Sequence, residues 1–395
     1  MRKTAITKRL QGTGGAKWEI HFKARQRLAE GKDVIELTIG EPDIPTPLEL
    51  IETANEAMLK GRTTYSDGAG EIGLRNALVE HYSKTCNRQF TKEQFLCFPG
   101  TQTSLFSVLM GVAEEGDEVL VGDPMYATYE GVIRACGAEM VPVPLRPENG
   151  FRISANDIAA RITPNTTALL LTTPHNPTGA VLREQDIKEI GQLAIKHDLW
   201  IISDEVYAML TFGNNTFYSP LCDPDIESRT IVVSSISKSH AAPGFRSGWC
   251  VGPTEFTERL LPFAEAMLFG NQPFIADMTE KAIREGSTVA QGMRDRYAAR
   301  ASMIEQRLSS ETSLHVVTPQ AGMFAMIDIS STNMSGQEYA HDLLDRFDVA
   351  VMPGSSFGTT VENWVRVALT IDDDRFAEAC NRIIIHSKEK SKIPA

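Results

Sequence analysis

The sequence predicts an α/β protein with a large domain, in which helices cover a mostly parallel sheet, and a smaller α+β domain. Three observations support this fold class. Six short apolar runs lie between about residues 90 and 255, separated by amphipathic stretches. One of these stretches, residues 183–198, carries its apolar residues on one helical face. After residue 300 the pattern changes to helical segments mixed with further strand-like segments.

The six apolar runs have the length of strands and are apolar at successive positions. This pattern is typical of parallel strands, because helices cover both faces of such a sheet. In chain order the runs are QFLCF (94–98), EVLVG (118–122), TALLL (167–171), WIIS (200–203), TIVV (230–233) and GWCVG (248–252).

The stretch between TALLL and WIIS predicts a helix, because Ile187, Ile190, Leu193 and Ala194 fall on one face. A helix between two such runs indicates a βαβ crossover. The second domain is expected from helical segments at 300–312 and 335–347 and from the strand-like GMFAMIDI, VAVMPG and WVRVALT.

The composition favours a soluble protein whose partners are small molecules. Its net charge of −12 leaves no basic excess for binding nucleic acid. No apolar run is long enough to span a bilayer, and the basic start MRKTAITKRLQGTGG lacks the apolar core of a signal peptide. The six cysteines show no metal-type spacing, so we expect buried reduced thiols and no metal site. A cytoplasmic location follows, without a membrane partner.

Polar residues follow the predicted strands, which is where open α/β sheets bind their ligands. The segment PGTQTSLFSVLMG leads from the first run into a helix through small and hydroxyl residues. Its free backbone N–H groups and positive dipole end would suit a phosphate. Alternatively, Thr101 or Thr103 simply caps the helix. The segment is neither a P-loop nor a dinucleotide-binding motif.

Two further candidates follow TALLL and WIIS. In TTPHNPTGA an ordinary turn is the default explanation of Asn176, although an amide held at a strand end is also a good donor to a ring oxygen. His175 is expected to be structural. Asp204 ends a buried run, so its carboxylate needs a partner such as a protonated pyridine nitrogen. Tyr207 would present its hydroxyl to the same ligand.

Cations follow apolar runs at two places. In SSISKSHAAPGFRSGW, Arg246 comes eight residues after Lys238, and both side chains could extend to water. Beside a phosphate, desolvation and neighbouring cations would instead favour the neutral amine of Lys238, which can form a Schiff base. Arg246 with the hydroxyls of Ser235 and Ser237 would then hold the phosphate. Arg366 interrupts the apolar NWVRVALT, and its fork suits a substrate carboxylate.

As a set, these motifs resemble the pyridoxal-phosphate-dependent aminotransferases of fold type I, class I/II. The set comprises the N-P-x-G loop, D-x-x-Y after a strand, S-x-S-K, the arginine eight residues after the lysine, and the late arginine. The resemblance covers essentially the whole chain. It implies a sheet of the seven-stranded type in a large cofactor-binding domain at 46–290, and a small domain formed by 1–45 and 291–395. It also implies a homodimer with active sites shared between two subunits.

The resemblance further implies pyridoxal 5′-phosphate as the cofactor and gives roles to individual residues. Lys238 would carry the cofactor as a Schiff base and move the proton between substrate and cofactor, and Asp204 would pair with the pyridinium nitrogen. Arg366 would bind the substrate α-carboxylate beside the backbone of Gly40. Other cofactor contacts would come from Asn176 and Tyr207 at the ring hydroxyl, Tyr126 at the ring face, Thr101, Gln102, Ser235, Ser237 and Arg246 at the phosphate, and Tyr65 at the phosphate bound to the neighbouring chain.

The substrate is inferred from departures within this family. Gln102 stands where aspartate aminotransferases of the nearest subgroup carry a lysine that reads the side-chain carboxylate, and a neutral amide lacks that attraction. The segments WEIHFKA, DPMYATYEGVIRACGAEMVPVP and SKSHA are more similar to arginine–pyruvate transaminases. We therefore expect a polar or basic L-amino acid as donor, pyruvate as acceptor, and Trp18 and Glu19 at the substrate site. Glu19 could also be an exposed residue at the start of a helix.

Three alternatives stay open at this point. An aspartate/2-oxoglutarate aminotransferase and a C–S β-lyase would use the same lysine, aspartate and arginine. The lyase would release ammonia without needing a 2-oxo acid. A ligand-sensing module of a transcription regulator would need an added DNA-binding domain, for which we expect no room before residue 40.

Overall fold

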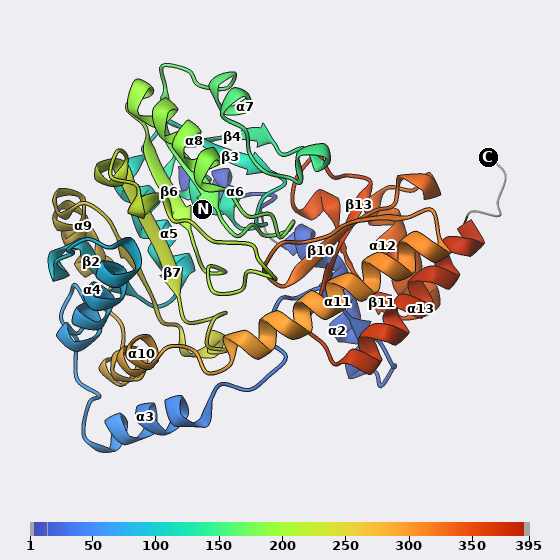
Figure 1. Cartoon of the computed structure of the whole chain (residues 1–395), viewed down its shortest axis with the longest axis horizontal. Helices are drawn as coiled ribbons and strands as arrows, with labels where there is room; N and C mark the ends of the chain where they lie inside the picture. The colour runs from blue at the N-terminus through green and yellow to red at the C-terminus, as the bar shows by residue number, and fades with distance from the viewer. Residues whose placement is uncertain (1–3, 14, 391–395) are drawn as a thin grey trace.

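A seven-stranded sheet forms the centre of the larger part of the computed structural model, which describes residues 4–13 and 15–390 (Figure 1). The strand order is β2-β8-β7-β6-β5-β3-β4, and within this sheet β8 is antiparallel to both of its neighbours. The strands are β2 (Phe95–Phe98), β3 (Glu118–Asp123), β4 (Glu139–Pro144), β5 (Thr166–Thr172), β6 (Trp200–Asp204), β7 (Thr230–Ser235) and β8 (Gly248–Val251). Each of the six predicted runs is therefore confirmed as a strand, and β4 was not predicted.

Helices cover both faces of this sheet, as the unbroken apolar runs predicted. In β5, Ala168 and Leu170 pack into one core cluster, whereas Leu169 and Leu171 pack into another on the opposite face. The helices around the sheet are α3 (Leu48–Leu59), α4 (Ile72–Cys86), α5 (Thr101–Val112), α6 (Tyr129–Cys136), α7 (Ala155–Ala159), α8 (Glu184–His197), α9 (Thr254–Met267) and α10 (Pro273–Glu285). In residues 4–13 and 15–390, no helix has the length and apolar character that crossing a membrane requires.

A smaller α+β unit packs beside the sheet (Figure 1). Its antiparallel sheet has the order β12-β13-β10-β9. The elements are α11 (Ala290–Glu311), β9 (His315–Val317), β10 (Phe324–Asp328), α12 (Gly336–Phe347), β11 (Val349–Ala350), β12 (Met352–Pro353), β13 (Trp364–Ala368) and α13 (Asp373–Lys390). The predicted segments at 300–312 and 335–347 are confirmed as parts of α11 and α12.

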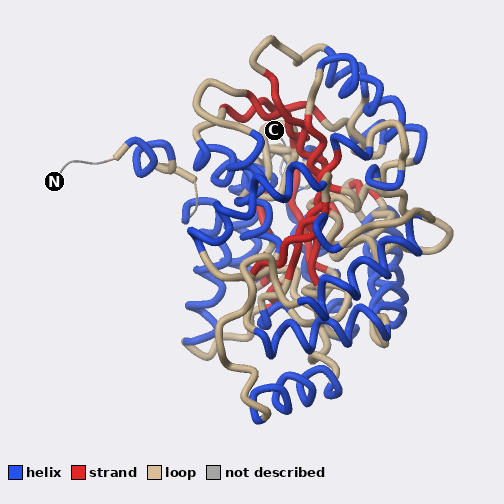
Figure 2. Tube along the Cα trace, turned by 90° about the vertical axis from the view of Figure 1, so that its left-hand side faces the viewer, coloured by secondary structure: helices blue, strands red, loops and turns tan. Residues whose placement is uncertain are grey.

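The N-terminal segment packs with this C-terminal unit. The strand β1 (Ile35–Glu36) pairs in parallel with β11. From α2 (Glu19–Ala29), Ile20 and Ala24 enter the same core as α11, α12 and α13. A short helix α1 (Ala5–Arg9) projects from the body (Figure 2).

The expectation of six reduced thiols is wrong for one pair of cysteines. Cys86, at the end of α4, forms a disulfide with Cys222 in the turn Pro220–Cys222, with Cα atoms 4.7 Å apart. The two cysteines are 136 residues apart in the chain, so no local spacing could signal the bond. The other four cysteines are free, and Cys97, Cys250 and Cys380 are buried as expected.

Candidate active site

A cavity of about 230 Å³ opens where the parallel strands of the large sheet end. Such sheets bind ligands at the carboxyl ends of their strands. The predicted site residues that line the cavity are Trp18, Gly40, Thr101, Gln102, Tyr126, Asn176, Asp204, Tyr207, Ser235, Ser237, Lys238, Arg246 and Arg366. Both parts of the molecule supply them, from the ends of strands, the start of α5 and the loops between elements.

Lys238 lies in the turn after β7, and its Nζ donates a 2.6 Å hydrogen bond to the carbonyl of Gly40. Burial, opposed by Glu41 and assisted by Arg366 and Arg246, lowers the pKa of this amine from 10.5 to about 8. In roughly a tenth of the molecules this amine is then neutral at pH 7, a far larger fraction than for a lysine in water. The surroundings therefore favour a nucleophilic amine.

Asp204 ends β6 and is buried. Its Oδ2 accepts a 2.8 Å hydrogen bond from the Tyr129 hydroxyl, and its Oδ1 accepts a longer one from the backbone N–H of Val206. Burial raises the pKa of the carboxyl to about 6. Within the part of the chain that the structure describes, no lysine, arginine or histidine forms an ion pair with it, so a cationic ligand would satisfy this carboxylate.

Arg366, in the middle of β13, is only 2% exposed. Its Nη1 donates to Oδ1 of Asn176 at 3.1 Å, and its Nη2 donates to the carbonyl of Thr38 at 2.5 Å. The guanidinium lies 3.8 Å from the ring centre of Phe324 and 4.4 Å from that of Phe357. Its Nε has no hydrogen-bond partner and, in residues 4–13 and 15–390, no carboxylate pairs with it. A buried guanidinium in this state suits an incoming carboxylate.

The start of α5 also lines the cavity. Neither threonine there caps the helix through its side chain, because the hydroxyl of Thr101 has no partner and that of Thr103 donates to the carbonyl of Pro99. Gly100 precedes the helix with φ +85°, and a Cβ atom at that position would stand 2.2 Å from Nη2 of Arg246. An unpaired hydroxyl, a helix N-terminus and an exposed arginine thus meet where the sequence predicted a phosphate.

Three residues considered from the sequence lie outside this cavity. Glu19 starts α2 with an exposed side chain and faces His341 at 3.5 Å and Gln337 at 3.4 Å. Tyr65 is 93% exposed and contacts the ring of Phe269. His175 is buried and hydrogen-bonded to Thr178, and burial lowers its pKa to about 3, which fits the structural role expected for it.

Two of the cavity-lining residues that were not singled out from the sequence contact Asp204 and Arg366. Tyr129 donates to Asp204, and its position three residues after Tyr126 in a quoted segment was a signal that could have found it. Phe324 packs on Arg366 and lies against Gly40, where a Cβ atom would come within 2.1 Å of its ring. Nothing in an alternating apolar strand marks that residue.

Comparison with known proteins accounts for this arrangement. The model of the family "Aminotransferase class I and II" matches residues 32–383. The chain belongs to that family. This aminotransferase is 39% identical to the arginine–pyruvate transaminase of Pseudomonas aeruginosa, over 98% of this chain and 99% of that protein. It is also 32% identical to the aspartate aminotransferase of Pyrococcus abyssi, over 91% of this chain and 93% of the relative.

Solved structures agree with the family and the fold. A double mutant of the aspartate aminotransferase of Thermus thermophilus is 28% identical and superposes with a TM-score of 0.91, covering 98% of this chain and all of that chain. The fold is thus that of fold type I aminotransferases, with a large α/β domain and a smaller domain, and the enzyme is a transaminase.

Proposed function

We propose that this aminotransferase uses pyridoxal 5′-phosphate and moves the amino group of arginine, or of another polar L-amino acid, to pyruvate. One observation carries the proposal: a single cavity holds the largely desolvated amine of Lys238, the carboxyl of Asp204 and the guanidinium of Arg366. Among the described residues, neither of the last two has an ion-pair partner. An aldehyde, a cationic ring nitrogen and a carboxylate would satisfy these three groups. The identity to an arginine–pyruvate transaminase supports the choice of substrates.

The residues around the cavity fit this cofactor. Asp204 would hold the ring nitrogen, and Tyr207 and Asn176, which both line the cavity, would face the ring hydroxyl. Tyr126 would cover one face of the ring. The phosphate would lie against α5 and its neighbours, contacting Thr101, Gln102, Ser235, Ser237 and Arg246. When bound, the cofactor supplies an electron sink for the substrate α-carbon.

The chain's own residues would then bind, orient and move a proton. Arg366 would take the α-carboxylate through its fork while the rings of Phe324 and Phe357 exclude water from the guanidinium. The Gly40 carbonyl would orient the amine of Lys238. Nζ of Lys238, with a pKa of about 8, would accept the proton from the substrate α-carbon and donate it to the cofactor carbon.

The choice of arginine over aspartate rests on Gln102. Its amide side chain carries no charge, and its Oε1 already accepts a 3.0 Å hydrogen bond from the hydroxyl of Thr128. A neutral amide attracts a side-chain carboxylate more weakly than a lysine does. We also propose that Trp18 and Glu19, at the start of α2, contribute to the substrate side of the site, with Glu19 drawn toward a cationic side chain.

We further propose a division into a large domain at 46–290 and a small domain of 1–45 with 291–395. The shared core of α2, α11, α12 and α13 supports it. The ends of the small domain, residues 1–3 and 391–395, lie outside the described residues. A homodimer completes the proposal, with Tyr65 of each chain reaching the phosphate bound to the other.

Steady-state kinetics on donor–acceptor pairs tests the substrate. We expect L-arginine with pyruvate to give a higher kcat/KM than L-aspartate with 2-oxoglutarate. The variant Gln102→Lys should raise the ratio of kcat/KM for aspartate to kcat/KM for alanine by roughly tenfold, which corresponds to about 1.4 kcal/mol. Taking the ratio removes any effect of the substitution on cofactor binding. Faster turnover of aspartate with 2-oxoglutarate by the wild type would overturn arginine as the donor. Ammonia release from sulfur amino acids without a 2-oxo acid would favour the β-lyase.

A further inference from the structure

Two cations of the cavity, Lys238 and Arg366, bind one short backbone segment. Residues 37–43, which we call the strap, connect β1 to the region before α3. The carbonyl of Thr38 accepts from Arg366 at 2.5 Å, and the carbonyl of Gly40 accepts from Lys238 at 2.6 Å. Two alternate carbonyls of the strap therefore fix the directions of the guanidinium and the amine.

The remaining carbonyls of residues 37–40 bind the chain after Arg366. The carbonyl of Leu37 accepts from the backbone N–H of Ala368 at 2.9 Å, and that of Ile39 accepts from the hydroxyl of Thr370 at 3.2 Å. Since Gly40 already lies against the ring of Phe324, the strap has little room to shift toward β10.

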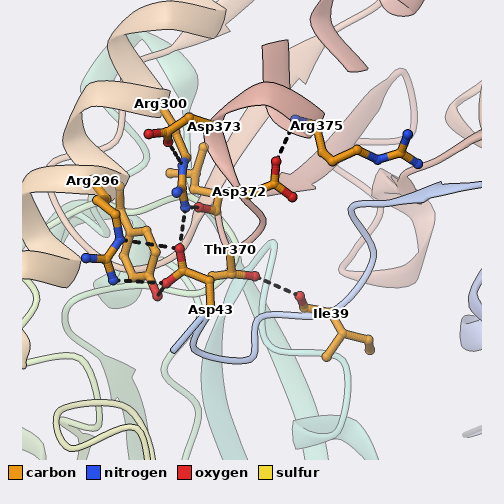
Figure 3. A network of polar contacts seen from close by, with 10 residues as sticks. Ile39, Asp43, Arg296, Arg300, Thr370, Asp372, Asp373 and Arg375 are labelled. Carbon is orange, nitrogen blue, oxygen red and sulfur yellow. Dashed lines mark hydrogen bonds and ion pairs between the residues drawn. The ribbon is translucent and has the colours of Figure 1, made fainter. Parts of the chain in front are cut away.

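The end of the strap is held by α11 (Figure 3). Oδ2 of Asp43 lies 2.7 Å from Nη1 of Arg300, and Oδ1 accepts a 3.0 Å hydrogen bond from the hydroxyl of Tyr297. Arg296 approaches the same carboxylate at 3.3 Å. The side chains of Asp43 and Arg300 are 9% and 3% exposed, so this pair is shielded from water and salt.

Arg300 is itself fixed in place. Its Nη1 also donates to the carbonyl of Leu369 at 2.8 Å, and its Nε binds Asp373, the first residue of α13, at 2.7 Å. Asp43 therefore binds a guanidinium that Leu369, just after β13, and Asp373, at the start of α13, already hold in a fixed orientation. A partner held this rigidly can set the position of the segment that binds it.

We propose that Asp43 is a positioning residue for the substrate site. Its bonds to Arg300 and Tyr297 hold the strap so that the carbonyls of Thr38 and Gly40 meet Arg366 and Lys238. We call Asp43 with Arg300 and Tyr297 the clamp. Its effect on the reaction rests on the proposed roles of Arg366 and Lys238. It joins the C-terminal helices α11 and α13 to Lys238 and Arg366 through residues that do not line the cavity.

The test compares the wild-type holoenzyme with Asp43→Asn and with a control, Asp342→Asn. Asp342 binds His386 at 2.8 Å and Lys390 at 2.8 Å in the same unit, between α12 and α13, and makes no bond to the strap. Asp43→Asn should lower kcat/KM for the amino acid roughly ten- to a hundred-fold, mostly through KM, because small displacements of binding groups have effects of this size. Hydrogen–deuterium exchange of residues 37–43 should rise in this variant.

The control separates positioning from stability. Asp342→Asn should lower the unfolding temperature but leave KM and exchange of the strap as in the wild type. If Asp43→Asn fails to fold, Thr370→Val removes the bond to Ile39 without unpairing a charge and should raise both KM and strap exchange. Wild-type KM and strap exchange in a folded Asp43→Asn enzyme would overturn the role of Asp43. Absence of turnover in the wild type would instead reject the proposed function, and exchange would still report on the strap.

Discussion

At the scale of the residue, the buried carboxyl of Asp204 lowers the stability of the folded protein at neutral pH. Burial raises the pKa of its carboxyl from 3.8 to about 6. Because the folded state then holds the proton more tightly than the unfolded state, stability falls as pH rises from about 4 to about 6, and the loss persists above that range. Two pKa units correspond to about 3 kcal/mol. We expect Asp204→Asn, whose oxygen can still accept from Tyr129, to raise the unfolding free energy of the cofactor-free protein by about this amount at pH 7 and by little at pH 4. Urea unfolding at the two pH values measures the difference, and an equal effect at both would show that the charge is not responsible.

At the scale of the element, the disulfide ties the end of α4 to the turn that carries Cys222. Ser219, three residues before Cys222, donates a 2.6 Å hydrogen bond to Glu205, so the disulfide also helps to hold the chain just after β6 in place. Removing a cross-link between distant residues relaxes the unfolded chain, and we expect the double variant Cys86→Ala with Cys222→Ala to lose about 2–4 kcal/mol of unfolding free energy. A reductant should destabilise the wild type in urea and leave the double variant unaffected. Six titratable thiols in unreduced, denatured wild-type protein would rule out the bond.

At the scale of the whole molecule, the proposed homodimer would cover the exposed aromatic pair Tyr65 and Phe269. Their side chains are 93% and 58% exposed and their ring centroids lie 6.3 Å apart, an unusual arrangement for a surface that faces only water. We expect light scattering to give a mass twice the 43.5 kDa of one chain. Tyr65→Phe should keep that mass but weaken pyridoxal phosphate binding roughly tenfold, about the effect of one hydrogen bond to a charged group. Tyr218→Phe is the matched control. If the protein were a monomer that binds pyridoxal phosphate with undiminished affinity, Tyr65 could not contribute to a site shared between two chains.

Most of the large sheet could be predicted because its strands are apolar on both faces. The strand β4 was missed because its sequence, EMVPVP, contains two prolines that interrupt the pattern, and such strands are tolerated at the sheet edge, where β4 lies. The strap and β1 were not visible in the periodicity, since their pairing with β11 and β13 joins the two ends of the chain.

The candidate site divides in the same way. Lys238, Asp204 and Arg366 could be found because a charged residue at the end or in the middle of an apolar run is itself a local signal. Phe324 and the clamp around Asp43 carry no such signal, and Tyr129 is marked only by its position three residues after Tyr126. Their meaning depends on contacts between elements that are distant in the sequence, such as the 2.8 Å bond from Tyr129 to Asp204 across 75 positions.

The most direct test of the central claim is the visible absorption spectrum of the pyridoxal-phosphate-loaded protein, titrated with L-arginine and then with pyruvate. The wild type should show a cofactor band that bleaches with the amino acid and returns with the 2-oxo acid, because both half-reactions take place in the same cavity. Lys238→Ala should not show this cycle. A wild-type protein that binds no pyridoxal phosphate, or whose band ignores every amino acid tested, would contradict the account of Lys238, Asp204 and Arg366 as one transaminase site.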